Sequence, residues 1–237
     1  MIERIFMNPI MHNFEEGTYE EYNSTTLAKL NFIRKVYLTF FASLLMATLG
    51  VFVGLTESIF LTVLQYQTMF VIVEVAVCLF AITVRRKPGI NLLALALFTF
   101  LSGLTLSPII AYYTAIGNVA IIKEALILTV VTFSGLTGYV FITKKDFSYL
   151  HGFLSMSLFG LIAVAIISIF FTMSPVVNLI YSYFGVLVFS GYILYDTSRI
   201  LHQWQSDDYV GFALQLYLDF INLFLYILRI LSSSDRD

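Results

Sequence analysis

Two aspartates lie within apolar stretches near the end of the chain. Asp196 stands in the segment FSGYILYDTSRIL, and Asp219 stands in LQLYLDFINLFLYILRIL. A carboxylate at the centre of a membrane helix costs roughly 2.5–3.5 kcal/mol on insertion scales. Two carboxylates on neighbouring apolar segments therefore predict a functional site. The chemistry that they indicate is the exchange of protons or the binding of cations.

The composition is that of an integral membrane protein. Hydrophobic residues make up 59% of the 237 residues and charged residues only 12%, and the mean hydropathy is +0.88. Soluble domains carry about 25% charged residues, so this chain lacks the polar surface that a water-exposed domain needs. No basic run with interleaved aromatic residues is present, so nucleic acid is not an expected partner. Membrane lipid is.

Seven apolar stretches are each long enough to cross a bilayer, which takes about 20 residues. They are Val36–Leu55, Leu61–Val84, Leu92–Tyr113, Val119–Ile142, Phe153–Met173, Val176–Ser198 and Val210–Leu231. The predicted fold is an all-α integral membrane protein with seven transmembrane helices. Its expected parts are a cytoplasmic tail over residues 1–35, the helical bundle over 36–231 and a short tail over 232–237.

Basic residues predict the orientation. Ten of them precede the first stretch or follow the second, fourth and sixth: Arg4, Lys29, Arg34, Lys35, Arg85, Arg86, Lys87, Lys144, Lys145 and Arg199. The connections after the first, third and fifth stretches contain none, unless Lys123 is counted. Because Lys and Arg concentrate on the cytoplasmic side, the N-terminus is predicted to be cytoplasmic. A bacterial plasma membrane is the expected location, with an internal eukaryotic membrane as the alternative.

The spacing of the two aspartates places them at one depth. Each lies 11 or 12 residues from the polar turn at Asp207–Asp208. In an antiparallel helical hairpin, residues equidistant from the turn lie at similar depth, so Asp196 and Asp219 can face each other. Two carboxylates at close range do not both ionise cheaply, and the pair would titrate as one unit.

Arg85 is the natural counter-charge for this pair, because it ends the second stretch at the same end of the bundle. An arginine that reached the pair would fasten the second helix to the hairpin. The alternative is that Arg85 belongs only to the positive-inside cluster.

Two glutamates are candidates for an ion pathway. Glu74 lies mid-membrane, 11 residues before Arg85, where it is either a cation stop or a hydrogen-bonded packing residue. Glu124 lies near the other end of the fourth stretch, where it is a cation entry site or half of a salt-bridged pair with Lys123.

Three further polar residues are candidates to support the aspartates. Asn222 follows Asp219 by one turn, and Tyr195 and Tyr217 each stand near an aspartate. Ordinary packing explains both tyrosines equally well. No histidine or cysteine has the spacing of a metal site, and no nucleotide or hydrolase motif is present, so no cofactor is expected.

The segments LYLDFINLFLYILRIL, YILYDTSRIL, FLSGLTLSPI and KKDFSYL together resemble the Bax inhibitor-motif family, over about residues 32–231. The chain looks most similar to the bacterial calcium-leak members. The resemblance implies seven helices with the last one at the centre, and a pH-sensitive calcium leak gated by a di-aspartyl pair. In this sequence the pair is Asp196 and Asp219, Arg85 matches the basic latch, and Glu74 matches a pore carboxylate. Calcium ions and protons then become expected partners, with Ca²⁺ held transiently by the two aspartates.

The leading hypothesis is therefore a calcium channel and not an enzyme. An intramembrane aspartyl protease is the first alternative, because it also uses two carboxylates that share a proton. Those proteases carry the second aspartate in a GxGD motif, whereas Leu216, Tyr217 and Leu218 precede Asp219 here. A proton-coupled transporter is the second alternative, and the paired broken helices typical of that class are not evident.

Overall fold

The computed structural model describes residues 3–206 and 208–234, with side chains over residues 24–206 and 208–233. The helices are α1 Glu3–Gly54, α2 Glu57–Gln65, α3 Gln67–Val84, α4 Ile90–Ala115, α5 Val119–Thr143, the 3₁₀ turn η1 Ser148–Leu150, α6 His151–Phe170, α7 Pro175–His202 and α8 Tyr209–Ser234. No strand occurs within these described ranges. The all-α prediction is confirmed.

Seven helices of the described chain are long and apolar enough to cross a membrane. They correspond to the seven predicted stretches, and two of the edges differ from the prediction by six residues or more. The predicted second stretch began at Leu61, but the helix breaks at Tyr66, within the polar run Gln65–Gln67, and only α3 qualifies as a span. At the other difference, α1 continues without interruption across the predicted boundary at residue 35, and its spanning part starts at Ser24.

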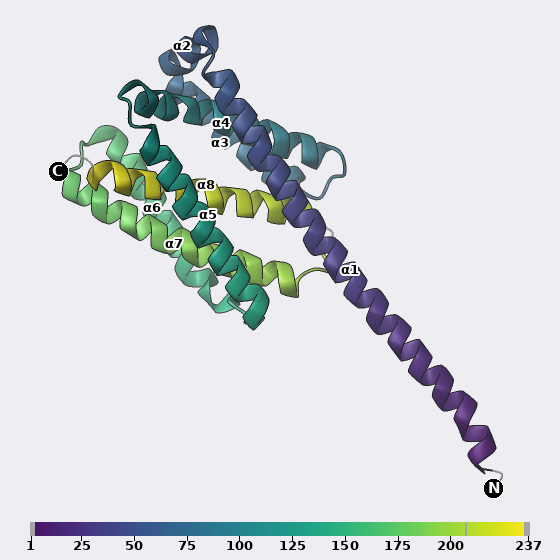
Figure 1. The fold of residues 1–237 in the computed structure, drawn as a ribbon. Coiled ribbons are helices and arrows are strands. Elements are labelled where there is room, and N and C mark those ends of the chain that lie inside the picture. Colours follow the sequence, from purple (N-terminus) through teal and green to yellow (C-terminus); the bar gives the residue numbers. More distant parts are fainter. Residues whose placement is uncertain (1–2, 207, 235–237) are drawn as a thin grey trace.

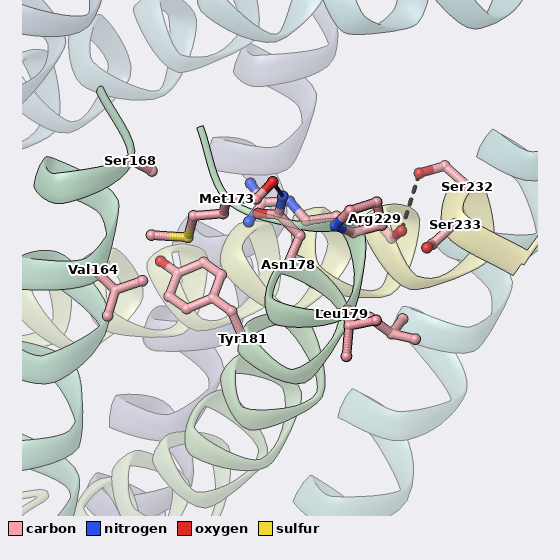
Figure 2. A pocket seen from close by; sticks show the side chains of 11 residues that line it. Val164, Ser168, Met173, Asn178, Leu179, Tyr181, Arg229, Ser232 and Ser233 are labelled. Atoms are coloured by element: carbon pink, nitrogen blue, oxygen red, sulfur yellow. Dashed lines mark hydrogen bonds between the residues drawn. The ribbon is translucent and has the colours of Figure 1, made fainter. Parts of the chain in front are cut away.

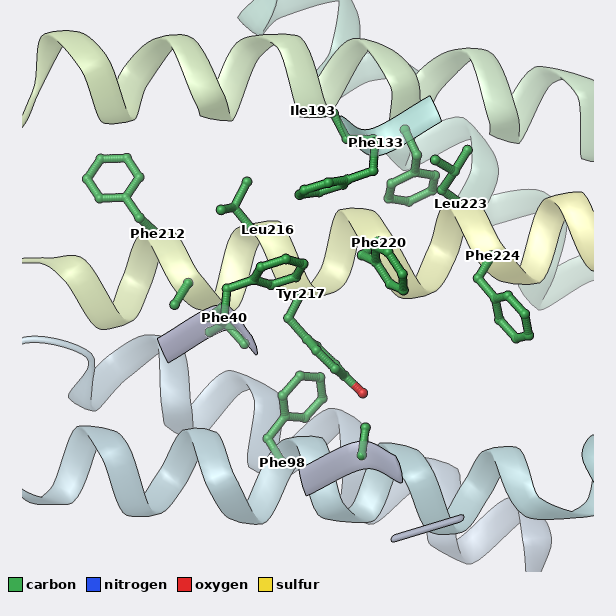
Figure 3. Close-up of a cluster of buried hydrophobic side chains, with 14 of the residues drawn as sticks. Phe40, Phe98, Phe133, Ile193, Phe212, Leu216, Tyr217, Phe220, Leu223 and Phe224 are labelled. Atoms are coloured by element: carbon green, nitrogen blue, oxygen red, sulfur yellow. The ribbon is translucent and has the colours of Figure 1, made fainter. Parts of the chain in front are cut away.

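Helix α8 lies at the centre of the bundle (Figure 1). Within the most apolar 18-residue stretch of each spanning helix, 61% of the residues of α8 are buried, against 44% or less in the other six. The expectation that the last helix is central is confirmed. Large side chains of α8 reach α1, α4, α5 and α7, and Figure 3 shows Phe212, Tyr217 and Phe220 among them. Phe220 packs edge-on against both Phe40 of α1 and Phe133 of α5.

Glycines set the close approach of α1 to α4. A Cβ atom on Gly103 would fall on the backbone carbonyl of Ala47, and a Cβ on Gly50 would fall on that of Phe100. Because backbone atoms cannot rotate away, only glycine allows these helices to approach so closely. This contact anchors α4, which in turn carries α3 on another face.

Local signals fix the ends of the helices that carry the aspartates. Ser174 caps α7 by accepting a hydrogen bond from Val177 N at 3.4 Å, and Pro175 occupies the first helical position, where its missing N–H costs nothing. Helix α8 follows Asp208, which accepts a hydrogen bond from Gly211 N at 3.1 Å. The antiparallel α7–α8 hairpin that results brings the two aspartates to the same depth.

Candidate functional site: a buried aspartate pair

Asp196 of α7 and Asp219 of α8 meet between their two helices. They are 4% and 3% exposed, and their carboxyl groups lie within hydrogen-bonding reach of each other. Taken as ionised, Asp219 Oδ2 is buried without a hydrogen-bond donor among the described residues. A proton shared between the two carboxyls would supply that missing donor. The geometry therefore suits a pair that holds one proton in common.

The counter-charge of the pair is Arg199. Its Nη1 lies 3.2 Å from Asp196 Oδ1, one turn along the same helix. The same nitrogen donates to Gln215 Oε1 of α8 at 3.4 Å. The guanidinium group also stacks on the ring of Phe212, 5.1 Å from its centroid. These contacts hold Arg199 between α7 and α8.

Arg199 was expected only to belong to the basic residues of the connections, and its contact with Asp196 was not predicted. The signal that identifies it is the spacing of YDTSR, because residues three apart on a helix lie on one face. A basic residue three positions after a buried aspartate is close enough to pair with it whatever the packing of the other helices.

Arg85 pairs with a different carboxylate from the one expected. Its Nε lies 3.0 Å from Asp208 Oδ2, and Arg86 Nε lies 3.8 Å from the same oxygen. Asp208 stands at the start of α8, near the end of the bundle where α3 ends, whereas Asp196 and Asp219 lie deeper. Arg85 thus joins the end of α3 to the start of α8, and not to the aspartate pair.

Glu74 faces α4. Its Oε2 accepts a hydrogen bond from Thr105 Oγ1 at 2.5 Å, and the side chain lines a cavity of about 560 Å³ between α3, α4 and α8. Glu124 is exposed on α5 and lines neither this cavity nor the two described below. The structure therefore separates the two predicted pathway glutamates.

The predicted supporting residues have other principal contacts. Asn222 Nδ2 donates to the backbone oxygen of Leu218 at 2.7 Å, although its side chain also lines the aspartate cavity. Tyr195 stacks on His151, with ring centroids 5.5 Å apart. Tyr217 is fully buried and packs edge-on against Phe98 of α4, on the other side of α8 (Figure 3). None of the three has a described hydrogen bond to an aspartate of the pair.

The aspartate pair and Glu74 line two adjoining cavities. Asp196, Asp219 and Arg199 line a cavity of about 610 Å³. It shares Val75, Leu218 and Asn222 with the Glu74 cavity, so those side chains are the walls between the two. A third cavity, of about 770 Å³, lies where α8 ends, and Arg229 borders both it and the Glu74 cavity (Figure 2).

Comparison with known proteins identifies the family. A family model described as "Inhibitor of apoptosis-promoting Bax1" matches residues 29–236. The chain belongs to the Bax inhibitor family. It is 36% identical to Bax inhibitor 1 of Schizosaccharomyces pombe, over 94% of this chain and 84% of that protein. It is 38% identical to an uncharacterized protein of Campylobacter jejuni, over 90% and 94% of the two chains.

The Bax inhibitor family also includes a viral relative. The Golgi anti-apoptotic protein of Vaccinia virus (strain Lister) is 34% identical, over 88% of this chain and 87% of that protein. The names of the fission yeast and viral relatives describe inhibitors of cell death, not enzymes.

The described part of this Bax inhibitor family member holds no group of three or more His, Cys, Asp or Glu side chains placed to bind a metal ion. Calcium is normally held by six to eight oxygen ligands. The aspartate pair supplies too few for a resident ion.

Proposed function

We propose that this Bax inhibitor family member is a pH-sensitive calcium leak channel gated by the Asp196–Asp219 pair. The observation that carries the proposal is the buried Oδ2 of Asp219, which lies beside Asp196 and has no other described donor. A proton on the pair joins α7 to α8. Loss of that proton leaves two like charges at close range in a buried site, which forces the helices apart or draws in a cation.

The route that we propose for the ion uses the cavities. Glu74 and the aspartate pair lie in adjoining cavities, with Val75, Leu218 and Asn222 between them. Oxygen ligands on both sides of this wall suit a hard cation such as Ca²⁺. Because the described ligands are few, each ion would bind only in passing, as conduction requires. Movement of α3, which carries both Glu74 and Val75, would open the wall.

Two latches hold the closed state in this mechanism. Arg199 neutralises Asp196 from within α7, and Arg85 holds the end of α3 on Asp208. The first latch contacts the titrating pair directly. The second lies outside the pair, so it restrains α3 whatever the protonation state of the aspartates.

We further propose that the N-terminus lies in the cytoplasm of a bacterial cell. The basic residues at the ends of α3, α5 and α7 support this orientation. Bacterial relatives that match most of the chain, such as those of Campylobacter jejuni and Helicobacter pylori, support the plasma membrane as the location.

The test is Ca²⁺ flux into proteoliposomes across roughly pH 5 to 8. Flux through the parent should change with pH, whereas flux through Asp219→Asn and Asp196→Asn should not. Glu57→Gln is the matched control, because it removes an exposed carboxylate on α2 and should keep the parental pH profile. An Asp219→Asn protein that folds and responds to pH like the parent would contradict the gate.

A further inference from the structure

The aspartate cavity is open toward the lipid. Val75 and Ile82 of α3 and Ile162 of α6 line it, and the same three side chains are 42–55% exposed on the surface of the bundle. Helix α3 packs chiefly on α4, and α6 packs chiefly on α7. Because α3 and α6 pack on different helices, the cavity opens between them, within the membrane-spanning part of the bundle.

One end of the cavity has one negative charge in excess when the aspartate pair has lost its shared proton. Asp196 and Asp219 contribute two carboxylates, and among the residues that line this cavity Arg199 contributes a cation, which is paired with Asp196. The other polar side chains that line the cavity are Gln215 and Asn222 of α8, His151 and Ser155 of α6, and the tyrosines Tyr181, Tyr192, Tyr195 and Tyr226. With both carboxylates ionised and His151 neutral, the sum is one negative charge, and Asp219 Oδ2 is the oxygen without a described donor. A single positive charge would complete the site.

The rest of the cavity is apolar and aromatic. The rings of Phe189, Tyr192 and Tyr226 line it, and Leu158 and Leu161 continue it along α6. Aromatic faces attract organic cations, and aliphatic walls favour a hydrocarbon chain. The cavity follows α6 from His151 to Ala165, a span of 15 residues that rises about 21 Å along the helix. Polar groups at one end of an apolar cavity are typical of small-molecule sites.

We propose that this cavity binds a lipophilic monovalent cation, such as a long-chain primary amine, which enters from the membrane between α3 and α6. The ammonium group lies against Asp219 Oδ2 and the hydrocarbon chain lies along α6. Charge decides between amphiphiles: a fatty acid would add a second uncompensated negative charge, and an alcohol would leave the existing one unpaired. Binding rests on the cavity alone. The further consequence, that a bound amine blocks calcium flux, rests on the proposed function.

The experiment uses full-length protein in zwitterionic lipid vesicles and a photoreactive dodecylamine as the probe. Cross-linked residues are mapped by mass spectrometry, and unlabelled dodecylamine, dodecanol and dodecanoate serve as competitors. We expect the label on the cavity-facing parts of α6, α7 and α8. Dodecylamine should compete at least tenfold better than dodecanol, and dodecanoate should not compete.

Variants separate the site from simple partition into the bilayer. Asp219→Asn should weaken labelling at least tenfold, and Asp219→Glu, which keeps the charge, should restore it. Ser155→Phe fills the cavity and should abolish labelling. Ser168→Phe on the same helix is its matched control, because Ser168 lines the cavity at the end of α8 and not the aspartate cavity, and this variant should label like the parent.

Equal labelling of the parent, Asp219→Asn and Ser155→Phe would overturn the proposal, because it would show partition into lipid alone. If Asp219→Asn does not fold, the comparison of Ser155→Phe with Ser168→Phe still distinguishes binding in the cavity from partition. The labelling does not depend on conduction. Labelling without any Ca²⁺ flux would therefore refute the channel and support the amine site. Ca²⁺ flux without labelling would refute the amine site and leave the channel proposal standing.

Discussion

The ion pair between Arg85 and Asp208 should control how firmly α3 is held. Two substitutions remove it with little other change. Arg85→Gln removes the cation, and Asp208→Asn removes the anion. Asparagine ranks with aspartate as a helix cap, so the hydrogen bond from Gly211 N to Oδ1 at position 208 should persist. The two variants therefore isolate the ion pair from the cap of α8.

The strength of this pair follows from its geometry and burial. Arg85 Nε and Asp208 Oδ2 are 3.0 Å apart, and their side chains are 35% and 10% exposed. Fully exposed pairs contribute about 0.2–1 kcal/mol, and hydrogen bonds to charged groups in proteins contribute about 1.5–3 kcal/mol. With one partner nearly buried and the other a third exposed, we expect about 1–2 kcal/mol. That corresponds to a roughly 5- to 30-fold larger population in which the end of α3 is detached.

Hydrogen exchange of the amides in the last turns of α3, in lipid vesicles, measures this population directly. Each single variant should exchange about 5- to 30-fold faster there, and the double variant should exchange no faster than either, because both changes remove the same interaction. Arg86→Gln is the matched control. Its Nε is 3.8 Å from the same oxygen and its side chain is 72% exposed, so its effect should be small.

Equal exchange rates in Arg85→Gln and Arg86→Gln would refute this role of the ion pair, and so would single-variant effects that add in the double variant. Calcium flux gives a second measurement. If α3 is the moving element of a channel, both single variants should leak more than the parent at every pH while keeping its pH dependence.

Two further predictions concern packing and the α5–α6 connection. Gly103→Ala should lower the thermal unfolding midpoint in detergent, by the equivalent of about 1–3 kcal/mol, because its Cβ meets the Ala47 carbonyl. Gly135→Ala, where the Cβ finds open space, should be neutral or stabilising, and equal losses in the two would contradict the contact. Asp146 lies outside the spanning helices, and hydrogen bonds from Ser148, its backbone N–H first, lower the pKa of its carboxyl below the ordinary 3.8. The carboxylate therefore stabilises the fold above pH 3.8 and loses this effect as the pH falls through the lowered pKa. Asp146→Asn should reduce the thermal unfolding midpoint at neutral pH and should match the parent in strong acid. A difference between variant and parent that does not change with pH would refute this.

The glycines show where prediction of packing from sequence reaches its limit. Gly50, Gly54, Gly103, Gly135 and Gly138 all stand in apolar segments with small neighbours. The first three pack closely at the α1–α4 contact, and the last two have open space where a Cβ would be. Sequence spacing identifies small residues on one face of a helix. It does not say which of those faces meets another helix.

The arginines illustrate the same limit for charge. The sequence correctly predicts that three arginines lie at the same end of the bundle: Arg85, Arg86 and Arg199. The fold decides which carboxylate each arginine contacts: Arg199 pairs with Asp196, and Arg85 pairs with Asp208. The central position of α8 was likewise expected only from the resemblance to a family, since its apolar content does not set it apart from the other spans.

Hydropathy and residue spacing were enough to predict a bundle of membrane-spanning helices with two aspartates at one depth. Both are local quantities, because hydropathy decides which segments enter lipid and a helix rises about 1.5 Å per residue. Packing between helices set the carboxylate that each arginine contacts, the helix that lies at the centre and the place where a cavity opens. Successive residues turn by about 100° around a helix axis, so a side chain's neighbours depend on the rotation and order of the helices, which no single segment specifies.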